Sequence, residues 1–270
     1  MGIGREDRLM GRIVLIAFLM GLVAIGAARA EESAADRQVR WQDLRHAVFG
    51  ERKIEDGVGT IVLDAPPRAI DAALVPVTID LVGPAKIKTV YLLIDENPSP
   101  LAGTFRFGPA ADTRELRTRV RVDTYTLMHA VAETEDGRLF VAETFVKAAG
   151  GCSAPSTQDQ KLALARLGQM KLKPVGTASA VQLLISHPNF NGMQMDQLTR
   201  NYTPARFIQD VKVTRGDALV FDLEADISLS EDPAITFGVK GKAAAPITVE
   251  VHDSANATFK QSFDLPERGS

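Results

Sequence analysis

Alternation of apolar and polar residues over short segments is the feature that most constrains the fold of this chain. Residues 116–123 read LRTRVRVD. Successive side chains of a strand point to opposite faces, so this pattern predicts a strand of an antiparallel sheet. Leu116 and Val120 would lie on the core face, and Arg119 and Arg121 would lie in solvent.

The same period recurs on both sides of residue 150 and predicts two groups of strands. The first group comprises Thr60–Leu63, Leu74–Leu81, Thr89–Ile94, Gly103–Phe107, the segment around 116–122, Thr126–Glu133 and Leu139–Val146. The second comprises Ala180–Ser186, Ile208–Thr214, Leu219–Leu223, Ile235–Lys240, Ile247–Val251 and Thr258–Phe263. Turn signals at 135–137 (EDG) and 253–256 (DSAN) separate neighbouring strands. We therefore expect a mainly β protein with two immunoglobulin-like β-sandwich domains, with a barrel as the alternative.

The segments between and before these groups set the domain boundaries. Residues 34–49 carry a helical pattern that Ser33 can cap and Gly50 can end. Residues 148–155 (AAGGCSAP) lack apolar periodicity, 156–170 offer a short helix, and 171–177 read as linker. We expect a first β domain with its helix over 31–152, a linker over 153–177 and a second β domain over 178–270.

The first thirty residues have the pattern of a secretory signal peptide. Arg5, Arg8 and Arg12 precede an apolar run over 13–28, which ends in an A-x-A site at Ala30. The alternative is a membrane anchor, but the run is shorter than the roughly 20 residues that a spanning helix needs. We expect cleavage after Ala30, a periplasmic location and no stable membrane anchor.

Charge and motif content argue against several classes of function. The chain has 31 basic and 34 acidic residues, for a formal net charge of -3, which disfavours an extended nucleic-acid-binding surface. One cysteine excludes an intramolecular disulfide and a Cys-rich zinc site. The four histidines are widely spaced, and no GxSxG, P-loop or GxGxxG pattern occurs. We expect no metal site, no cofactor and no enzymatic activity.

The single cysteine, Cys152, is the residue most indicative of function. It follows Gly150 and Gly151, which supply backbone freedom without side-chain bulk. An odd thiol in an oxidising compartment is a liability, which suggests that it has a use. We expect Cys152 to be a thiol handle at the end of a flexible arm. A surface cysteine without function, and a thiol enzyme that pairs Cys152 with His187 or His129, are the alternatives.

Several segments resemble known sulfur-oxidation proteins. Residues 87–98 (IKTVYLLIDENP), 104–107, 118–122, 136–140 and 145–147, closing with Gly150-Gly151-Cys152, resemble SoxY. Residues 184–188 (LISHP), 204–208 and 232–237 resemble SoxZ. The order predicts a fused SoxY–SoxZ-like periplasmic carrier, similar to those associated with quinoprotein dehydrogenases. In SoxY a Gly-Gly-Cys-Gly-Gly motif ends the chain, whereas Ser153, Ala154 and a whole second domain follow the cysteine here.

The resemblance implies a non-enzymatic carrier of a sulfur or other thiol-linked group. Cys152 would be the covalent attachment point, Gly150 and Gly151 would form the swinging arm, and periplasmic partner enzymes would act on the adduct. The implied partners include a quinoprotein (PQQ) dehydrogenase and a c-type cytochrome. The alternative is an accessory module that binds such a dehydrogenase or its cytochrome, with Cys152 incidental.

Overall fold

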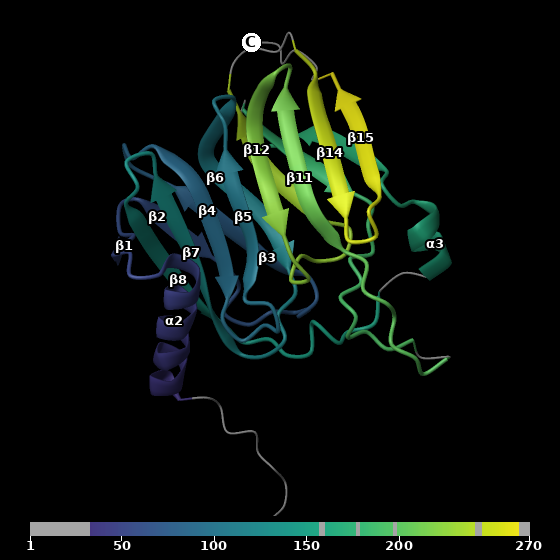
Figure 1. The fold of residues 1–270 in the computed structure, drawn as a ribbon, viewed down its shortest axis with the longest axis horizontal. Coiled ribbons are helices and arrows are strands. Elements are labelled where there is room, and N and C mark those ends of the chain that lie inside the picture. The colour runs from purple at the N-terminus through teal and green to yellow at the C-terminus, as the bar shows by residue number, and fades with distance from the viewer. Residues whose placement is uncertain (1–32, 157–159, 177–178, 197–198, 241–244, 265–270) are drawn as a thin grey trace, which may run out of the picture. The chain divides into compact units, whose positions relative to one another are not determined.

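The computed structural model describes residues 33–156, 160–176, 179–196, 199–240 and 245–264. The predicted signal peptide and its cleavage site after Ala30 lie outside these residues. Within them, the strands form two sheets (Figure 1). In spatial order the larger sheet contains β1 (Ile54–Asp56), β8 (Leu139–Val146), β7 (Thr126–Thr134), β4 (Ile87–Ile94), β5 (Leu101–Phe107), β12 (Ala218–Ala225), β11 (Ile208–Arg215), β14 (Ile247–Asp253) and β15 (Thr258–Phe263). The smaller contains β2 (Ile61–Asp64), β3 (Val75–Leu81), β6 (Ala111–Val120), β13 (Ala234–Val239), β10 (Ala180–Ile185) and β9 (Met170–Pro174).

The prediction of a mainly β protein with immunoglobulin-like sandwich layers is confirmed, and all of the predicted strands are present. The two halves of the chain nevertheless share both sheets. β5 pairs antiparallel with β12, and β6 pairs antiparallel with β13. This pairing satisfies backbone groups that separate sandwiches would leave at exposed edges.

One hydrophobic core runs between the two sheets and across the boundary between the halves. Phe221 of β12 packs on Phe237 of β13 with ring centroids 4.9 Å apart, and on Phe105 of β5 at 6.0 Å. Aromatic pairs in these tilted and edge-on geometries add to the stabilisation from buried area. The three rings therefore join both halves and both sheets.

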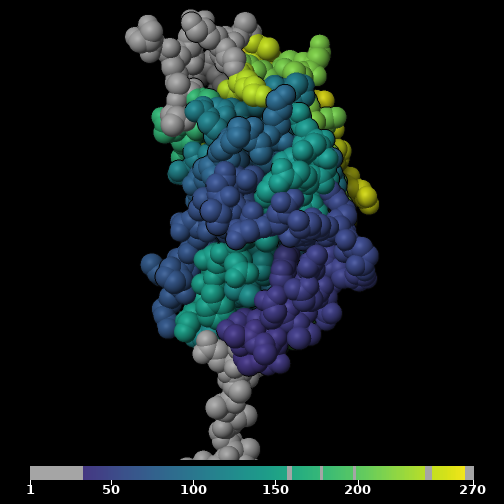
Figure 2. Space-filling view, turned by 90° about the vertical axis from the view of Figure 1, so that its left-hand side faces the viewer, coloured from purple at the N-terminus to yellow at the C-terminus, as the bar shows by residue number. Residues whose placement is uncertain are grey.

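Helix α2 (Ala34–Phe49) has the predicted bounds and covers the outer face of the larger sheet. Trp41 and Phe49 form a second apolar cluster with Leu93, Val131 and Leu139 of β4, β7 and β8. In the space-filling view, purple residues of the N-terminal segment lie against blue and teal ones of the first half (Figure 2). Val39, an apolar residue of the same helix, is 62% exposed.

Part of the predicted linker over 153–177 forms regular structure. Helix α3 (Gln160–Ala165) lies within the predicted short helical segment, and β9 pairs antiparallel with β10 at the edge of the smaller sheet. Met170 of β9 is buried, whereas Lys171 and Lys173 point outward. Of the helices in the described parts of the chain, none is long and apolar enough to cross a bilayer.

Candidate functional site

The arm that carries Cys152 starts where β8 ends and lies against the body of the protein. The Gly150 amide donates to the Asp123 carbonyl at 2.7 Å, and the Gly151 amide donates to the Val122 carbonyl at 2.9 Å. The arm predicted to be flexible is thus docked in this structure. Strand β6 ends at Val120, so the Val122 and Asp123 carbonyls are not used in strand pairing and can accept hydrogen bonds from the arm.

Both glycines contribute to docking through their lack of a side chain. A Cβ on Gly151 would lie 2.1 Å from the Ala72 carbonyl oxygen and 2.5 Å from the Val122 carbonyl oxygen, which no side chain tolerates. Gly150 has φ +77°, in the left-handed region that favours glycine. The sequence predicted that these residues give the arm reach, and the structure adds that they allow close backbone packing.

Cys152 lies at the junction between the halves of the chain. Its side chain is 1% exposed, and its carbonyl accepts a hydrogen bond of 2.6 Å from Nδ2 of Asn191, which belongs to the second half. Burial, together with the nearby Asp123 carboxylate and against the opposing effect of Arg121, raises the pKa of the thiol to about 12. In the docked position the thiol is therefore protonated at neutral pH and is a poor nucleophile.

Arg121 overturns one sequence prediction. The alternation placed it in solvent, but its side chain is fully buried. β6 ends at Val120, so the period of two no longer applies, and residues 120–122 are buried in succession. The Arg121 guanidinium donates from Nη1 to the Gly151 carbonyl at 3.4 Å. Nε and Nη2 are buried without a hydrogen-bond partner in the described part of the chain.

The environment of Arg121 is unfavourable for its charge. Burial lowers the pKa of the guanidinium, although Glu231, Cys152 and Asp71 act electrostatically in the opposite direction. Arginine remains charged at neutral pH even so, because its ordinary pKa is above 12. The site therefore combines a protonated thiol with a buried cation whose hydrogen-bonding capacity is largely unused.

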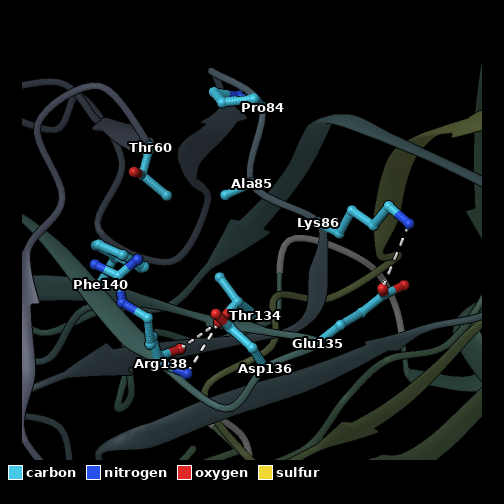
Figure 3. A pocket seen from close by; sticks show the side chains of 9 residues that line it. All are labelled: Thr60, Pro84, Ala85, Lys86, Thr134, Glu135, Asp136, Arg138 and Phe140. Carbon is cyan, nitrogen blue, oxygen red and sulfur yellow. Dashed lines mark hydrogen bonds and ion pairs between the residues drawn. The ribbon is translucent and has the colours of Figure 1, made fainter.

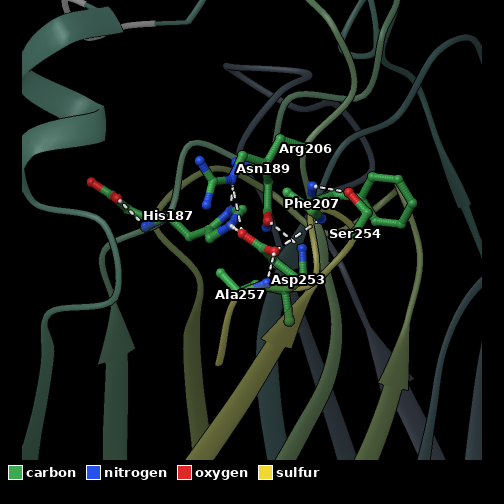
Figure 4. Close-up of polar contacts among 10 residues, drawn as sticks. His187, Asn189, Arg206, Phe207, Asp253, Ser254 and Ala257 are labelled. Atoms are coloured by element: carbon green, nitrogen blue, oxygen red, sulfur yellow. Dashed lines mark hydrogen bonds and ion pairs between the residues drawn. The ribbon is translucent and has the colours of Figure 1, made fainter. Parts of the chain in front are cut away.

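His187, which was considered as the partner of Cys152 in a thiol enzyme, belongs to a separate hydrogen-bond network (Figure 4). Its Nδ1 accepts from the Asn189 amide at 3.1 Å, and its Nε2 faces Asp253 Oδ2 at 3.5 Å. Burial lowers the pKa of His187, and Asp253 offsets this in part. Burial alone would raise the pKa of Asp253, but bonds from the Ala257 amide and Arg206 hold it below its ordinary value.

His129, the other candidate, lies beneath helix α2. Its ring stacks on Trp41 with centroids 3.7 Å apart, Nδ1 is 2.9 Å from Asp95 Oδ1, and Nε2 is 3.2 Å from Glu143 Oε2. Among the described residues, neither His129 nor His187 forms a hydrogen bond with the Cys152 thiol. The geometry does not assemble a Cys–His pair.

A cavity of about 500 Å³ lies at the β7–β8 hairpin (Figure 3), and its lining includes none of the residues that hold the arm. Its lining is mixed in charge and includes Lys86, Glu135 and Arg138. Arg138 pairs with Glu55 at 3.0 Å, and Lys86 faces Glu135 at 3.8 Å. These cations and carboxylates compensate one another at the exposed hairpin.

The fold and the site define a β-sandwich protein with one thiol on a glycine-rich arm. The family model described as sulfur oxidation protein SoxY matches residues 45–152, and the model described as sulphur oxidation protein SoxZ matches residues 169–264. Together they match about three quarters of the chain. The chain therefore belongs to the SoxY and SoxZ families of sulfur oxidation proteins, which it joins in tandem.

The SoxY match ends at Cys152 itself, which places the thiol at the end of the SoxY-like half. The chain also matches the solved structure of the sulfur carrier protein SoxY from Chlorobium limicola f thiosulfatophilum. The identity is 25% and the TM-score is 0.37, with 42% of this chain and 96% of that chain covered. A search of curated proteins returned no significant relative.

The sequence pointed to Cys152 and its two glycines but missed the residues around them. Arg121 was hidden by an alternating pattern that runs past the end of its strand. Asn191 stands in a loop, and only the tertiary fold brings it to Cys152, 39 residues away in sequence. The dense amide run over 189–194 (NFNGMQ) was the one local signal, since buried amides in a loop need specific partners.

Proposed function

We propose that this protein is a non-enzymatic periplasmic carrier that binds a sulfur or other thiol-linked group covalently on Cys152. The observation that supports it most directly is the position of Cys152 at the end of the SoxY match, on an arm held by a few main-chain hydrogen bonds. Such contacts are individually weak, so the arm can dock and undock. Partner enzymes supply the catalysis.

Loading follows thiol exchange chemistry once the arm is undocked. The Cys152 thiolate attacks the sulfur of a persulfide- or disulfide-type donor on a partner enzyme. A new S–S bond to Cys152 forms while the donor's own S–S bond breaks and the donor thiolate leaves. The exchange conserves electrons, so it requires no external oxidant.

The resemblance to carriers associated with quinoprotein dehydrogenases suggests the partners. We propose that enzymes of a quinoprotein (PQQ) dehydrogenase system, with its c-type cytochrome, act on the protein in the periplasm. The signal-peptide pattern of residues 1–30, with cleavage after Ala30, supports this location.

Intact-mass measurement of the protein taken from its native periplasm tests the carrier function. We expect a mass above that of the mature chain, because a group is attached to Cys152. A reductant should remove this added group, and the Cys152→Ser variant should lack it. A free thiol under every growth condition, together with full biological function of Cys152→Ser, would contradict the proposal. The measured mass also identifies the cargo.

An accessory interaction module is the second candidate, and the 1% exposure of Cys152 is the observation that favours it. In that case the thiol is a buried small residue, and binding uses sheet edges such as β15. A pull-down of the dehydrogenase or cytochrome separates the two. Binding that is indifferent to Cys152→Ser but is lost when a proline replaces Lys260 in β15 would support the module.

A further inference from the structure

Arg121 is the one cation of the described structure that is both fully buried and largely unpartnered beside Cys152. Its side chain has zero exposure, and its one hydrogen bond is the long contact of 3.4 Å from Nη1 to the Gly151 carbonyl. A guanidinium carries five N–H donors, and leaving them unsatisfied away from water is costly. A fold retains such a group more readily when something else satisfies it for part of the time.

The unused donors have a specific arrangement. Nε and Nη2, the two nitrogens without a partner, lie on the same edge of the planar guanidinium. Their N–H bonds point in one direction and form the fork that binds two oxygens of a carboxylate, sulfonate or phosphate. The third nitrogen, Nη1, faces the arm through Gly151.

The charges around Arg121 leave this fork open. Glu231 and Asp71 stabilise the cation electrostatically, yet neither one provides a hydrogen bond to it. Glu231 accepts from Ser156 Oγ at 2.8 Å, and Asp71 accepts from the Ala73 amide at 2.8 Å. Asp123 acts on Cys152, and its carbonyl holds Gly150.

We propose that the guanidinium of Arg121 binds the terminal oxyanion of a group attached to Cys152, so that the docked arm is selective for anionic cargo of the sulfonate class. This inference rests on the proposed carrier function and assigns a specificity-determining residue to it. The Cys152 side chain fills its present site, so a loaded group needs room. We expect the exposed Ser153 and Pro155, which follow the cysteine, to move outward and provide it.

Two small reagents of different charge test the proposal on the full chain without knowledge of the natural cargo. 2-Sulfonatoethyl methanethiosulfonate and 2-hydroxyethyl methanethiosulfonate each form a disulfide with the Cys152 thiolate and release methanesulfinate. The two adducts differ chiefly in the terminal sulfonate. Amide hydrogen exchange of Gly150 and Gly151, whose amides are bonded when the arm is docked, reports docking.

In the natural sequence, we expect the Gly150 and Gly151 amides to exchange at least tenfold more slowly in the sulfonate adduct than in the hydroxyethyl adduct. The difference should vanish in Arg121→Gln and return in part in Arg121→Lys, which keeps the charge but loses the fork. Equal exchange of the two adducts in the natural sequence would overturn the proposal, and this comparison needs no variant to fold.

The outcome is separable from a failure of the carrier function. Equal exchange of the adducts, with a native adduct still found by mass, removes the role of Arg121 and leaves the carrier intact. A folded protein whose thiol reacts with neither reagent would overturn both, because no adduct could then exist for Arg121 to bind.

Discussion

Gly151→Ala should release the arm and expose the thiol. The new Cβ would lie 2.1 Å from the Ala72 carbonyl oxygen and 2.5 Å from the Val122 carbonyl oxygen. Both are backbone atoms of the body, so they cannot move aside as the end of a flexible side chain would. The arm must instead lift away, and its hydrogen bonds to Asp123, Val122 and Asn191 are lost.

The size of the effect follows from those three bonds. They join Gly150 N to Asp123 O, Gly151 N to Val122 O, and Asn191 Nδ2 to Cys152 O, at 2.7, 2.9 and 2.6 Å. At about 1 kcal/mol net each, docking is worth about 3 kcal/mol, so the arm is undocked about one hundredth of the time. Reaction within the docked state is slower still. A rise in the pKa of Cys152 from 9.0 to about 12 lowers the thiolate fraction at neutral pH by about three powers of ten.

The rate of reaction with a disulfide reagent such as Ellman's reagent measures this. We expect Gly151→Ala to react about 100-fold faster than the natural sequence at neutral pH. Gly150→Asn is the matched control. A Cβ at residue 150 would meet only the Ser153 hydroxyl oxygen, at 3.9 Å, within 4 Å, and asparagine tolerates the left-handed backbone at φ +77°. We expect it to react within a few-fold of the natural rate.

The reasoning would be refuted by a folded Gly151→Ala protein whose thiol reacts no faster than that of the natural sequence. Far-ultraviolet circular dichroism establishes whether the sheets are intact. Equal acceleration in both glycine variants would also refute it, since general loosening of the arm would then replace the specific clash at residue 151.

Three further predictions concern the arm, its cation and the helix. Docking raises the pKa of Cys152, so the free energy of docking is at its full value below about pH 9 and falls by about 1.4 kcal/mol per pH unit as the pH rises towards 12. Limited proteolysis should therefore cleave the arm faster as the pH rises from 8 to 10 in the natural chain, and should show no such change in Cys152→Ser. Arg121→Met should stabilise the unloaded protein in urea by about 1–3 kcal/mol, because it removes a buried cation whose one hydrogen bond is long. A lower urea midpoint would show instead that the charge holds the fold together. Trp41→Ala should weaken docking of the helix by about 3–5 kcal/mol, because a buried ring stacked on His129 is lost. Circular dichroism should then show less helix with the sheet signal retained. Val39→Ala, at a site 62% exposed, should change neither the helix signal nor the sheet signal.

Local pattern predicted the elements well where one periodicity held over a whole segment. Helix α2 starts and ends where the sequence indicated, with Gly50 at φ +61° donating its amide to the His46 carbonyl as a C-terminal cap. The short β1 and the edge strand β9 were missed. Three residues carry too little pattern to identify β1, and β9 contains two lysines and ends in Pro174.

Long-range pairing was beyond the reach of such patterns. Alternation states which face of a strand is apolar but not which strand lies beside it. The joins between β5 and β12 and between β6 and β13 therefore came only from the structure. The same limit hid the site, because the contact between Asn191 and Cys152 exists only once the two halves share their sheets.

Shared sheets and a continuing chain together limit how far the thiol can travel. Lys147 is fixed at the base of the arm, where its amide donates to the Pro67 carbonyl and its carbonyl accepts from the Ala69 amide, both at 3.0 Å. Cys152 follows five residues later, so at roughly 3.3–3.6 Å per residue the Cα of the undocked Cys152 reaches at most about 18 Å from that base. The chain continues through Ser153 into the second half, so a partner must admit a loop with two strands of backbone. On the proposed carrier function, the partner site is therefore a wide cleft that lies close to this protein's own surface. Docking of the arm on the partner then competes with the contacts that Asn191 and Arg121 make with the arm.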